Sequence, residues 1–269
     1  MKYLKNFYKY RYLLYEIVRK NIKLQYRNSV LGIFWTFLQP LMTTIVLVLV
    51  FGGIFGRKDA SMVNYPIYLL CGRLIYEFFT QSTKRAMRSI RLSASVIKKV
   101  YVPKYIYPLS NVIANFITFL ISLLVLACFI IYFYFFSAEQ PHITPYIFLA
   151  VVPIAILLVL CVGVGLILCT MEVFFKDVEY LYEVFCMLLF YMTPIFYKVE
   201  QLHISSKIIR MALMANPLYS ITEMFRDCVL FGEMFNVNHL LYSLAFSLLC
   251  VVAGLWMFYK KQDKFILHI

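Results

Sequence analysis

Long apolar stretches recur along the whole chain and are separated by short polar segments. Residues 28–56 and 105–138 contain no Asp, Glu, Lys or Arg, and about 20 apolar residues suffice to cross the hydrocarbon core of a bilayer. The other predicted spans cover 66–83, 146–170, a stretch that ends near Tyr197, and 240–259. The pattern therefore predicts an all-α membrane protein with six transmembrane helices in one domain, 28–269. Gln39-Pro40 predicts a kink in the first of them.

Residues 1–27 follow a different pattern, in which charged and apolar positions separate onto two sides of a helix. Leu14, Ile17 and Ile22 lie on the apolar side, and Arg11 is an exception. This arrangement predicts an amphipathic helix in the membrane interface, with a soluble surface helix as the alternative. The charged arc comprises Lys2, Lys5, Lys9, Glu16, Arg19, Lys20, Lys23 and Arg27.

Residues 198–238 mix polar and apolar positions and are too polar to form one span. Apolar pieces at 211–215 and 229–231 predict short amphipathic or re-entrant helices on the extracytoplasmic face. Asn216-Pro217 is expected to interrupt them, because the residue before a proline disfavours helical backbone.

Composition supports the membrane assignment, since 63% of the residues are hydrophobic and 14% are charged, against about a quarter charged in soluble domains. A net charge of +13 would suggest nucleic acid in a soluble protein, but the basic residues cluster beside apolar stretches. Such clusters mark the cytoplasmic side of membrane proteins. We therefore expect a multi-pass membrane protein with both termini in the cytoplasm, in contact with lipids and not with nucleic acid.

One cytoplasmic loop, predicted over 84–104, contains seven basic residues and no acidic residue. It has two candidate roles besides setting topology. It can dock onto an acidic protein surface, or it can hold a lipid phosphate. These interpretations are compatible with one another.

Arg73 and Glu77 lie four residues apart within the predicted second span. This spacing places them on one helix face, and ionisable residues in a span usually face a protein interior or an aqueous path. They are candidates for lining a conduit or fixing a subunit contact. The alternative is a self-neutralising pair near the outer interface.

Aromatic side chains are abundant, with 25 Phe and 22 Tyr. Interfacial belts account for many of them, but two groups are unusually dense, and such faces could let a sugar chain slide by stacking. The alternative is packing or lipid contact. The candidate residues are Phe34, Trp35 and Phe37 in the first span, and Phe190, Tyr191, Phe196 and Tyr197 at the end of the fifth.

Catalytic and cofactor signatures are missing from the sequence. There is no GxxxxGK[ST] loop for ATP, no nucleophile elbow, and no pair of His or Cys residues at metal-ligand spacing among the four histidines and seven cysteines. We therefore expect a non-enzymatic chain that binds no cofactor or metal. The only acidic group that would suit a membrane enzyme comprises Glu172, Asp177, Glu179 and Glu183.

Several segments, in order along nearly the whole chain, resemble the type-2 ABC exporter permeases that move lipid-linked polysaccharides such as O-antigen, capsule and teichoic acid. Each segment alone is a weak signal, but the ordered set is specific. Arg73 and Glu77 lie outside these segments, so the resemblance assigns them no role. The segments are Asn21–Trp35, Leu38–Leu41, Val96–Lys104, Pro108–Ser110, Val173–Val178, Thr193–Tyr197 and Asn216–Leu218.

The resemblance implies a homodimer of six-span subunits with two copies of a separate ABC ATPase, which would bind ATP and Mg. It also implies that the first and fifth spans line the conduit, that the loop at 84–104 includes a coupling helix, and that residues 198–238 form an extracytoplasmic gate. The residues expected to meet the ATPase are Arg88, Arg91, Lys98, Lys99, Tyr101 and Lys104.

The predicted function is export of a polyprenyl-pyrophosphate-linked polysaccharide across the cytoplasmic membrane. A basic cytoplasmic face suits an anionic lipid headgroup. Two alternatives remain open at this stage. One is an ABC exporter of drugs or small lipids on the same fold, and the other is an integral membrane enzyme that transfers glycans.

Overall fold

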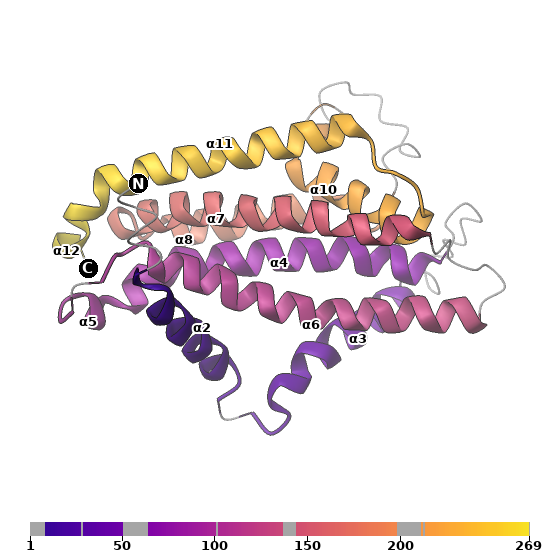
Figure 1. The fold of residues 1–269 in the computed structure, drawn as a ribbon, viewed down its shortest axis with the longest axis horizontal. Helices are drawn as coiled ribbons and strands as arrows, with labels where there is room; N and C mark the ends of the chain where they lie inside the picture. Colours follow the sequence, from indigo (N-terminus) through magenta and orange to yellow (C-terminus); the bar gives the residue numbers. More distant parts are fainter. Residues whose placement is uncertain are drawn as a thin grey trace.

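The computed structural model describes residues 9–27, 29–50, 64–100, 102–136, 144–197, 211 and 213–268. Throughout these ranges the regular structure is helical and no strand occurs, which confirms the all-α prediction. Four long helices lie side by side and form the body of the molecule (Figure 1). They are α4 (Tyr65–Leu92), α6 (Ile106–Phe136), α7 (Val151–Phe174) and α11 (Val237–Lys261).

Among the described residues, three helical segments are long and apolar enough to cross a membrane, namely 106–136, 145–174 and 237–268. The second consists of a 3-10 turn, η3 (Pro145–Ala150), that runs directly into α7, and the third continues from α11 through η6 (Gln262–Lys264) into α12 (Phe265–His268). These segments confirm the predicted third, fourth and sixth spans.

The predicted first and fifth spans are represented by α3 (Trp35–Val48) and α8 (Val178–Met192) among the described residues. A 3-10 turn, η1 (Gly32–Phe34), leads into α3, and the predicted continuation at 51–56 lies outside the described residues. Helix α8 has 15 residues, which at 1.5 Å per residue gives about 22 Å. This length falls short of a hydrocarbon core of about 30 Å, so the total of six spans stays a prediction.

The prediction of a loop over 84–104 is wrong for residues 84–92, because α4 continues to Leu92. The reason is that Ala86, Met87 and Ile90 are fully buried and extend the apolar face of α4 beyond Thr83. Spacings of three and four residues place these side chains on one side of a helix. Between α4 and α6 lies a short helical turn, α5 (Ala94–Ile97).

Helices α7 and α11 pack along much of their length (Figure 1), and glycines let their backbones approach closely. A Cβ atom added to Gly163 would lie 2.6 Å from the backbone nitrogen of Val251. A Cβ atom added to Gly254 would lie 2.7 Å from the carbonyl oxygen of Gly163. Small residues at such crossings are typical of helix packing in membranes.

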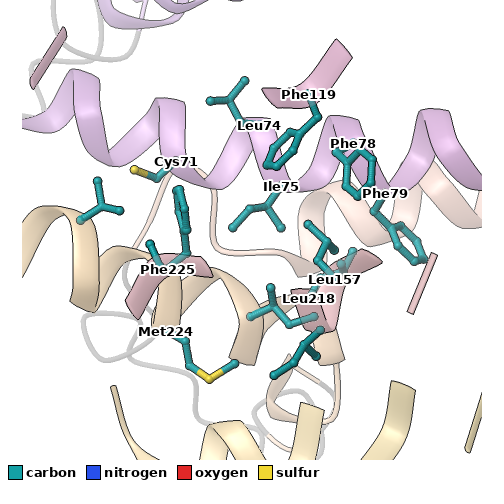
Figure 2. Close-up of a cluster of buried hydrophobic side chains, with 14 of the residues drawn as sticks. Cys71, Leu74, Ile75, Phe78, Phe79, Phe119, Leu157, Leu218, Met224 and Phe225 are labelled. Atoms are coloured by element: carbon teal, nitrogen blue, oxygen red, sulfur yellow. The ribbon is translucent and has the colours of Figure 1, made fainter. Parts of the chain in front are cut away.

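A buried apolar cluster joins α4, α6, α7 and α10 (Pro217–Arg226) (Figure 2). Asn216 accepts a hydrogen bond from the Leu218 amide at 3.0 Å and caps α10, and Pro217 occupies the first turn. The predicted breaker at Asn216-Pro217 is therefore the start of a helix, since proline fits that position. One π-helical turn, η5 (Asp227–Phe231), follows. The re-entrant path of this segment stays a prediction. Residues 198–210 lie outside the described residues.

The helix of the basic N-terminal segment, α2 (Arg11–Gln25), runs obliquely to the four long helices (Figure 1). It buries Val18 and leaves Arg19, Lys20 and Lys23 exposed, as expected for an amphipathic helix. Arg85 of α4 donates a hydrogen bond to the Gln25 side-chain oxygen at 2.7 Å. Residues 1–8, which the sequence predicts as the start of the amphipathic helix, lie outside the described part of the chain.

Pro40 lies inside α3, where it has no N–H to donate to the carbonyl group of Thr36. Ser122 of α6 donates its hydroxyl hydrogen to that carbonyl oxygen at 3.3 Å. Backbone groups freed by a proline in a membrane helix are commonly satisfied by a neighbouring helix in this way. The Thr36 carbonyl group, which Pro40 leaves without a donor from its own helix, therefore links α3 to α6.

Candidate functional site

Arg73 and Glu77 form an ion pair on the surface of α4. The Nε and Nη2 atoms of Arg73 donate to Oε1 of Glu77 at 2.9 and 2.7 Å. Their side chains are 17% and 25% exposed, so both groups are largely withdrawn from solvent. The predicted meeting of these residues on one helix face is confirmed.

A cavity of about 150 Å³ lies against this pair. It brings together α3, α4 and the end of α8, and its walls are mainly aromatic and aliphatic. The rings of Tyr76 and Phe190 meet edge to face with centroids 5.2 Å apart, and those of Phe190 and Phe196 do the same at 5.2 Å. Tyr76 also donates its hydroxyl hydrogen to the carbonyl oxygen of Cys186 at 2.7 Å. The ion pair therefore lies beside a layer of packed rings.

A second cavity, of about 80 Å³, lies on another side of Glu77. Its walls are rich in polar side chains, of which Gln25 and Tyr26 come from the N-terminal segment and the others from helices that the sequence predicts as membrane spans. Asn115 donates to Ser82 at 3.1 Å, and Tyr26 and Thr36 share a hydrogen bond of 2.7 Å. Its polar lining comprises Gln25, Tyr26, Thr36, Gln39, Glu77, Gln81, Asn115, Thr118 and Ser122, with Trp35 at the edge.

The structure thus brings together five of the residues predicted to line a conduit: Trp35, Arg73, Glu77, Phe190 and Phe196. Glu77 contributes to both cavities and connects the polar one with the aromatic one.

The other predicted conduit residues lie beside this group. Phe34 and Tyr191 are exposed, and Phe34 stacks on Phe37 with ring centroids 5.9 Å apart. Tyr197 donates its hydroxyl hydrogen to the carbonyl oxygen of Tyr191 at 2.6 Å, and its own carbonyl accepts from Tyr68 at 2.9 Å. Tyr197 therefore fixes the chain after α8, while Phe34 and Tyr191 face outward.

A cluster of ion pairs joins α4, α7 and α8 at the opposite end of α4. Arg91 contacts Glu172 of α7 at 3.0 Å and Glu179 of α8 at 2.6 Å. Arg88 contacts Glu179 at 2.6 Å and Glu183 at 3.4 Å. The side chain of Glu172 is 0% exposed, and a buried charge needs such a partner. These acids, which the enzyme alternative requires, thus contact arginines of the same chain, and Asp177 is exposed on the turn between α7 and α8.

The residues predicted to meet an ATPase are therefore in different situations. Arg88 and Arg91 contact acidic residues of this chain, whereas Lys98 and Lys99 are exposed just after α5. Lys104 is partly buried and donates to the carbonyl oxygen of Gln262. Tyr101 lies outside the described residues. Helix α5 protrudes at the same end of the molecule as α12 (Figure 1).

Arg226 is a functional candidate that the sequence patterns did not single out. Its side chain is 0% exposed and stacks on the ring of Tyr68 at 3.5 Å from the ring centroid. It contacts Glu223 at 3.0 Å and donates to the carbonyl oxygen of Tyr68 at 3.2 Å. Gly72 provides the room, because a Cβ atom there would lie 2.6 Å from Nη2 of the arginine. The three-residue spacing from Glu223 was the one signal in the sequence.

Comparison with known proteins extends this picture to the whole chain. Residues 12–230 match the profile of a family described as ABC-2 type transporter. The O-antigen export system permease protein RfbA of Klebsiella pneumoniae is 30% identical over 256 residues, which cover 94% of this chain and 93% of that protein. RfbA of Myxococcus xanthus is 26% identical over 98% of both chains. The polysialic acid transport protein KpsM of Escherichia coli is 24% identical over 91% of both.

Proposed function

The chain belongs to the ABC-2 type transporter family, and we propose that it is the permease subunit that exports a polyprenyl-pyrophosphate-linked polysaccharide across the bacterial cytoplasmic membrane. The observation that carries this proposal is similarity to O-antigen and polysialic acid transport proteins over nearly the full length of both chains. Both names refer to polysaccharides. Export of drugs or small lipids has no comparable support.

The energy source is proposed to be a separate ABC ATPase. The sequence contains no GxxxxGK[ST] loop that could cradle the phosphates of ATP, so ATP and Mg would bind to the partner. The working assembly is a homodimer of this chain with two ATPase copies. Six spans with both termini in the cytoplasm would place α5 on the ATPase side, in agreement with the basic residues that gather at that end.

The candidate path follows the Arg73–Glu77 pair and the rings beside it. Sugar rings stack on aromatic faces while their hydroxyl groups need hydrogen-bond partners, and the aromatic and polar cavities beside Glu77 offer both. The opposite charges of the pair neutralise one another, which reduces the cost of holding ionised groups in a span. A neutral pair of this kind lets a polar chain pass without trapping it at a single strong charge.

Deletion and complementation in the native host test the proposal. Without this chain, labelled polysaccharide should accumulate inside the cell and disappear from the surface, and the intact gene should restore it. Unchanged surface polysaccharide in the deletion strain, together with lost resistance to a drug, would contradict the proposal and favour the drug-exporter alternative.

The two tryptophans provide a matched test of the path. Trp35 lies beside the polar cavity, whereas Trp256 is exposed on α11. We expect Trp35→Ala to slow the appearance of surface polysaccharide by about tenfold or less, the effect of about 1.4 kcal/mol, at equal protein abundance. Trp256→Ala should leave the rate unchanged. Equal rates in the two variants would remove Trp35 from the path.

A further inference from the structure

A separate cavity of about 330 Å³ lies among α4, α6, α7 and α11. This volume is within the range of about 300 to 1,000 Å³ that is usual for small-molecule sites. The cavity lies between helices that Figure 1 shows side by side, and its lining includes no residue of α3 or α8. It is therefore distinct from the two cavities beside Glu77.

Small residues, Ala86 and Gly165, form part of the wall of this cavity where α4 meets α7. A Cβ atom added to Gly165 would lie 2.9 Å from the Cβ atom of Ala86, so α4 and α7 are in close contact there. Val112 and Val162 form part of the wall from α6 and α7. The lining is almost entirely apolar, and an occupant must therefore present hydrocarbon to it.

Two residues of the lining carry a polar group, Tyr105 and Tyr259. The hydroxyl oxygen of Tyr105 is buried, and none of the described residues provides a hydrogen-bond partner for it. A buried polar group without a partner is destabilising. A ligand with one oxygen atom near the mouth would satisfy this hydroxyl group.

Basic residues are neighbours of both tyrosines in the sequence, and their ammonium groups lie near the rings of Phe265, Trp256 and Phe174 at this end of the bundle. Lys104 directly precedes Tyr105, and Lys260 and Lys261 directly follow Tyr259. Lys104 donates to the backbone carbonyl of Gln262 and so joins the two segments at this end of the bundle. Tyrosine next to lysine at the end of a membrane helix is typical of the level of lipid headgroups, and basic clusters there attract anionic lipids.

We propose that this cavity binds one acyl chain of an anionic phospholipid of the surrounding bilayer. The acyl chain occupies the apolar space between α6, α7 and α11. The Tyr105 hydroxyl group donates to an ester oxygen of the lipid, and the anionic headgroup lies at the basic end of the bundle, to which Lys104, Lys260 and Lys261 belong. The cavity is away from the Arg73–Glu77 path, so the occupant is a bilayer lipid and not the isoprenoid carrier of an exported glycan. The site stands whether or not the exported substrate is a polysaccharide.

Native mass spectrometry of the full chain, purified together with any subunits that accompany it, tests the site. The complex is exchanged through a delipidating detergent, and the phospholipid that stays bound is weighed. Val162→Phe fills the cavity, and Val252→Phe, at an exposed position of α11, is the matched control. Tyr105→Phe removes only the hydroxyl group, with Tyr132→Phe on the exposed face of α6 as its control.

We expect one phosphatidylglycerol or cardiolipin molecule per chain in the parent protein and in both controls. Val162→Phe should abolish the retained lipid, and Tyr105→Phe should lower its occupancy several-fold. The far-ultraviolet circular dichroism spectrum of each variant checks folding. Equal retention in Val162→Phe and Val252→Phe, no retained lipid in the parent protein, or an isoprenoid mass in place of a phospholipid would each overturn the proposal.

Discussion

The two halves of the basic segment 84–104 look alike in sequence but lie in different surroundings. In the first half, Arg88 and Arg91 extend from α4 and contact Glu172, Glu179 and Glu183. In the second half, Lys98 and Lys99 lie exposed beyond α5. The first half therefore holds three helices of the same chain together, and the second presents its charges outward.

The different surroundings of the two halves arise because only the first half belongs to α4. Met87 and Ile90 alternate with the arginines and are fully buried, which fixes that face of α4 against its neighbours. Arginine suits such a position because its planar fork can bind two carboxylates at once. The lesson is that charges in one basic stretch beside a span can differ, since some form ion pairs within the chain and others are exposed.

The largest effect should follow from Arg91→Met. The substitution leaves the buried carboxylate of Glu172 without its 3.0 Å partner, and breaking a buried pair costs about 3 kcal/mol. Thermal unfolding of the purified protein in detergent measures the loss. The double variant Arg91→Met, Glu172→Gln should lose less, because the unpaired charge is gone. If Arg91→Met unfolds at the same temperature as the wild-type protein, the ion pairs of the first half do not hold these helices together.

An intermediate effect is expected from Lys98→Glu with Lys99→Glu. Reversing two exposed charges should weaken binding of the ATPase subunit about tenfold, or about 1.4 kcal/mol, because the acidic side chains would face an acidic surface. The thermal unfolding temperature should stay unchanged. Affinity is measured on the purified components at two salt concentrations, with Lys98→Arg, Lys99→Arg as the charge-preserving control. Loss of stability together with unchanged affinity would reverse the roles of the two halves.

The smallest effect is expected at the edge of the ion-pair cluster. Lys84 is 4.0 Å from Glu183, and their side chains are 33% and 50% exposed. Exposed pairs contribute about 0.5 kcal/mol or less, so Lys84→Ala should leave the unfolding temperature within about one degree. A loss as large as that of Arg91→Met would mean that burial does not distinguish the members of the cluster.

Local patterns in the sequence were sufficient for part of this structure. The long uncharged stretches predicted α6, α7 and α11, and four-residue spacing predicted the pairing of Arg73 with Glu77. These features depend on neighbours along one helix, which a sequence displays directly.

Contacts between distant segments could not be predicted from a single sequence. The stacking of Arg226 on Tyr68 joins residues 158 positions apart, and the pairing of Arg91 with Glu172 joins α4 to α7. The extension of α4 was missed because its charged residues concealed the apolar period of Ala86, Met87 and Ile90. The aromatic residues were found as a group, but only the fold brings Phe190 to Tyr76 and leaves Tyr191 exposed.

Site-specific photocrosslinking tests most directly whether the second half of the basic segment is the docking surface. A benzophenone amino acid is placed at Lys99 and, for comparison, at Phe148, which is exposed on η3 at the other end of the bundle (Figure 1). Irradiation of cells should join the variant at position 99 to the ATPase subunit and leave the variant at position 148 unattached. An ATPase adduct at 148 and none at 99 would contradict both the docking surface and the proposed orientation.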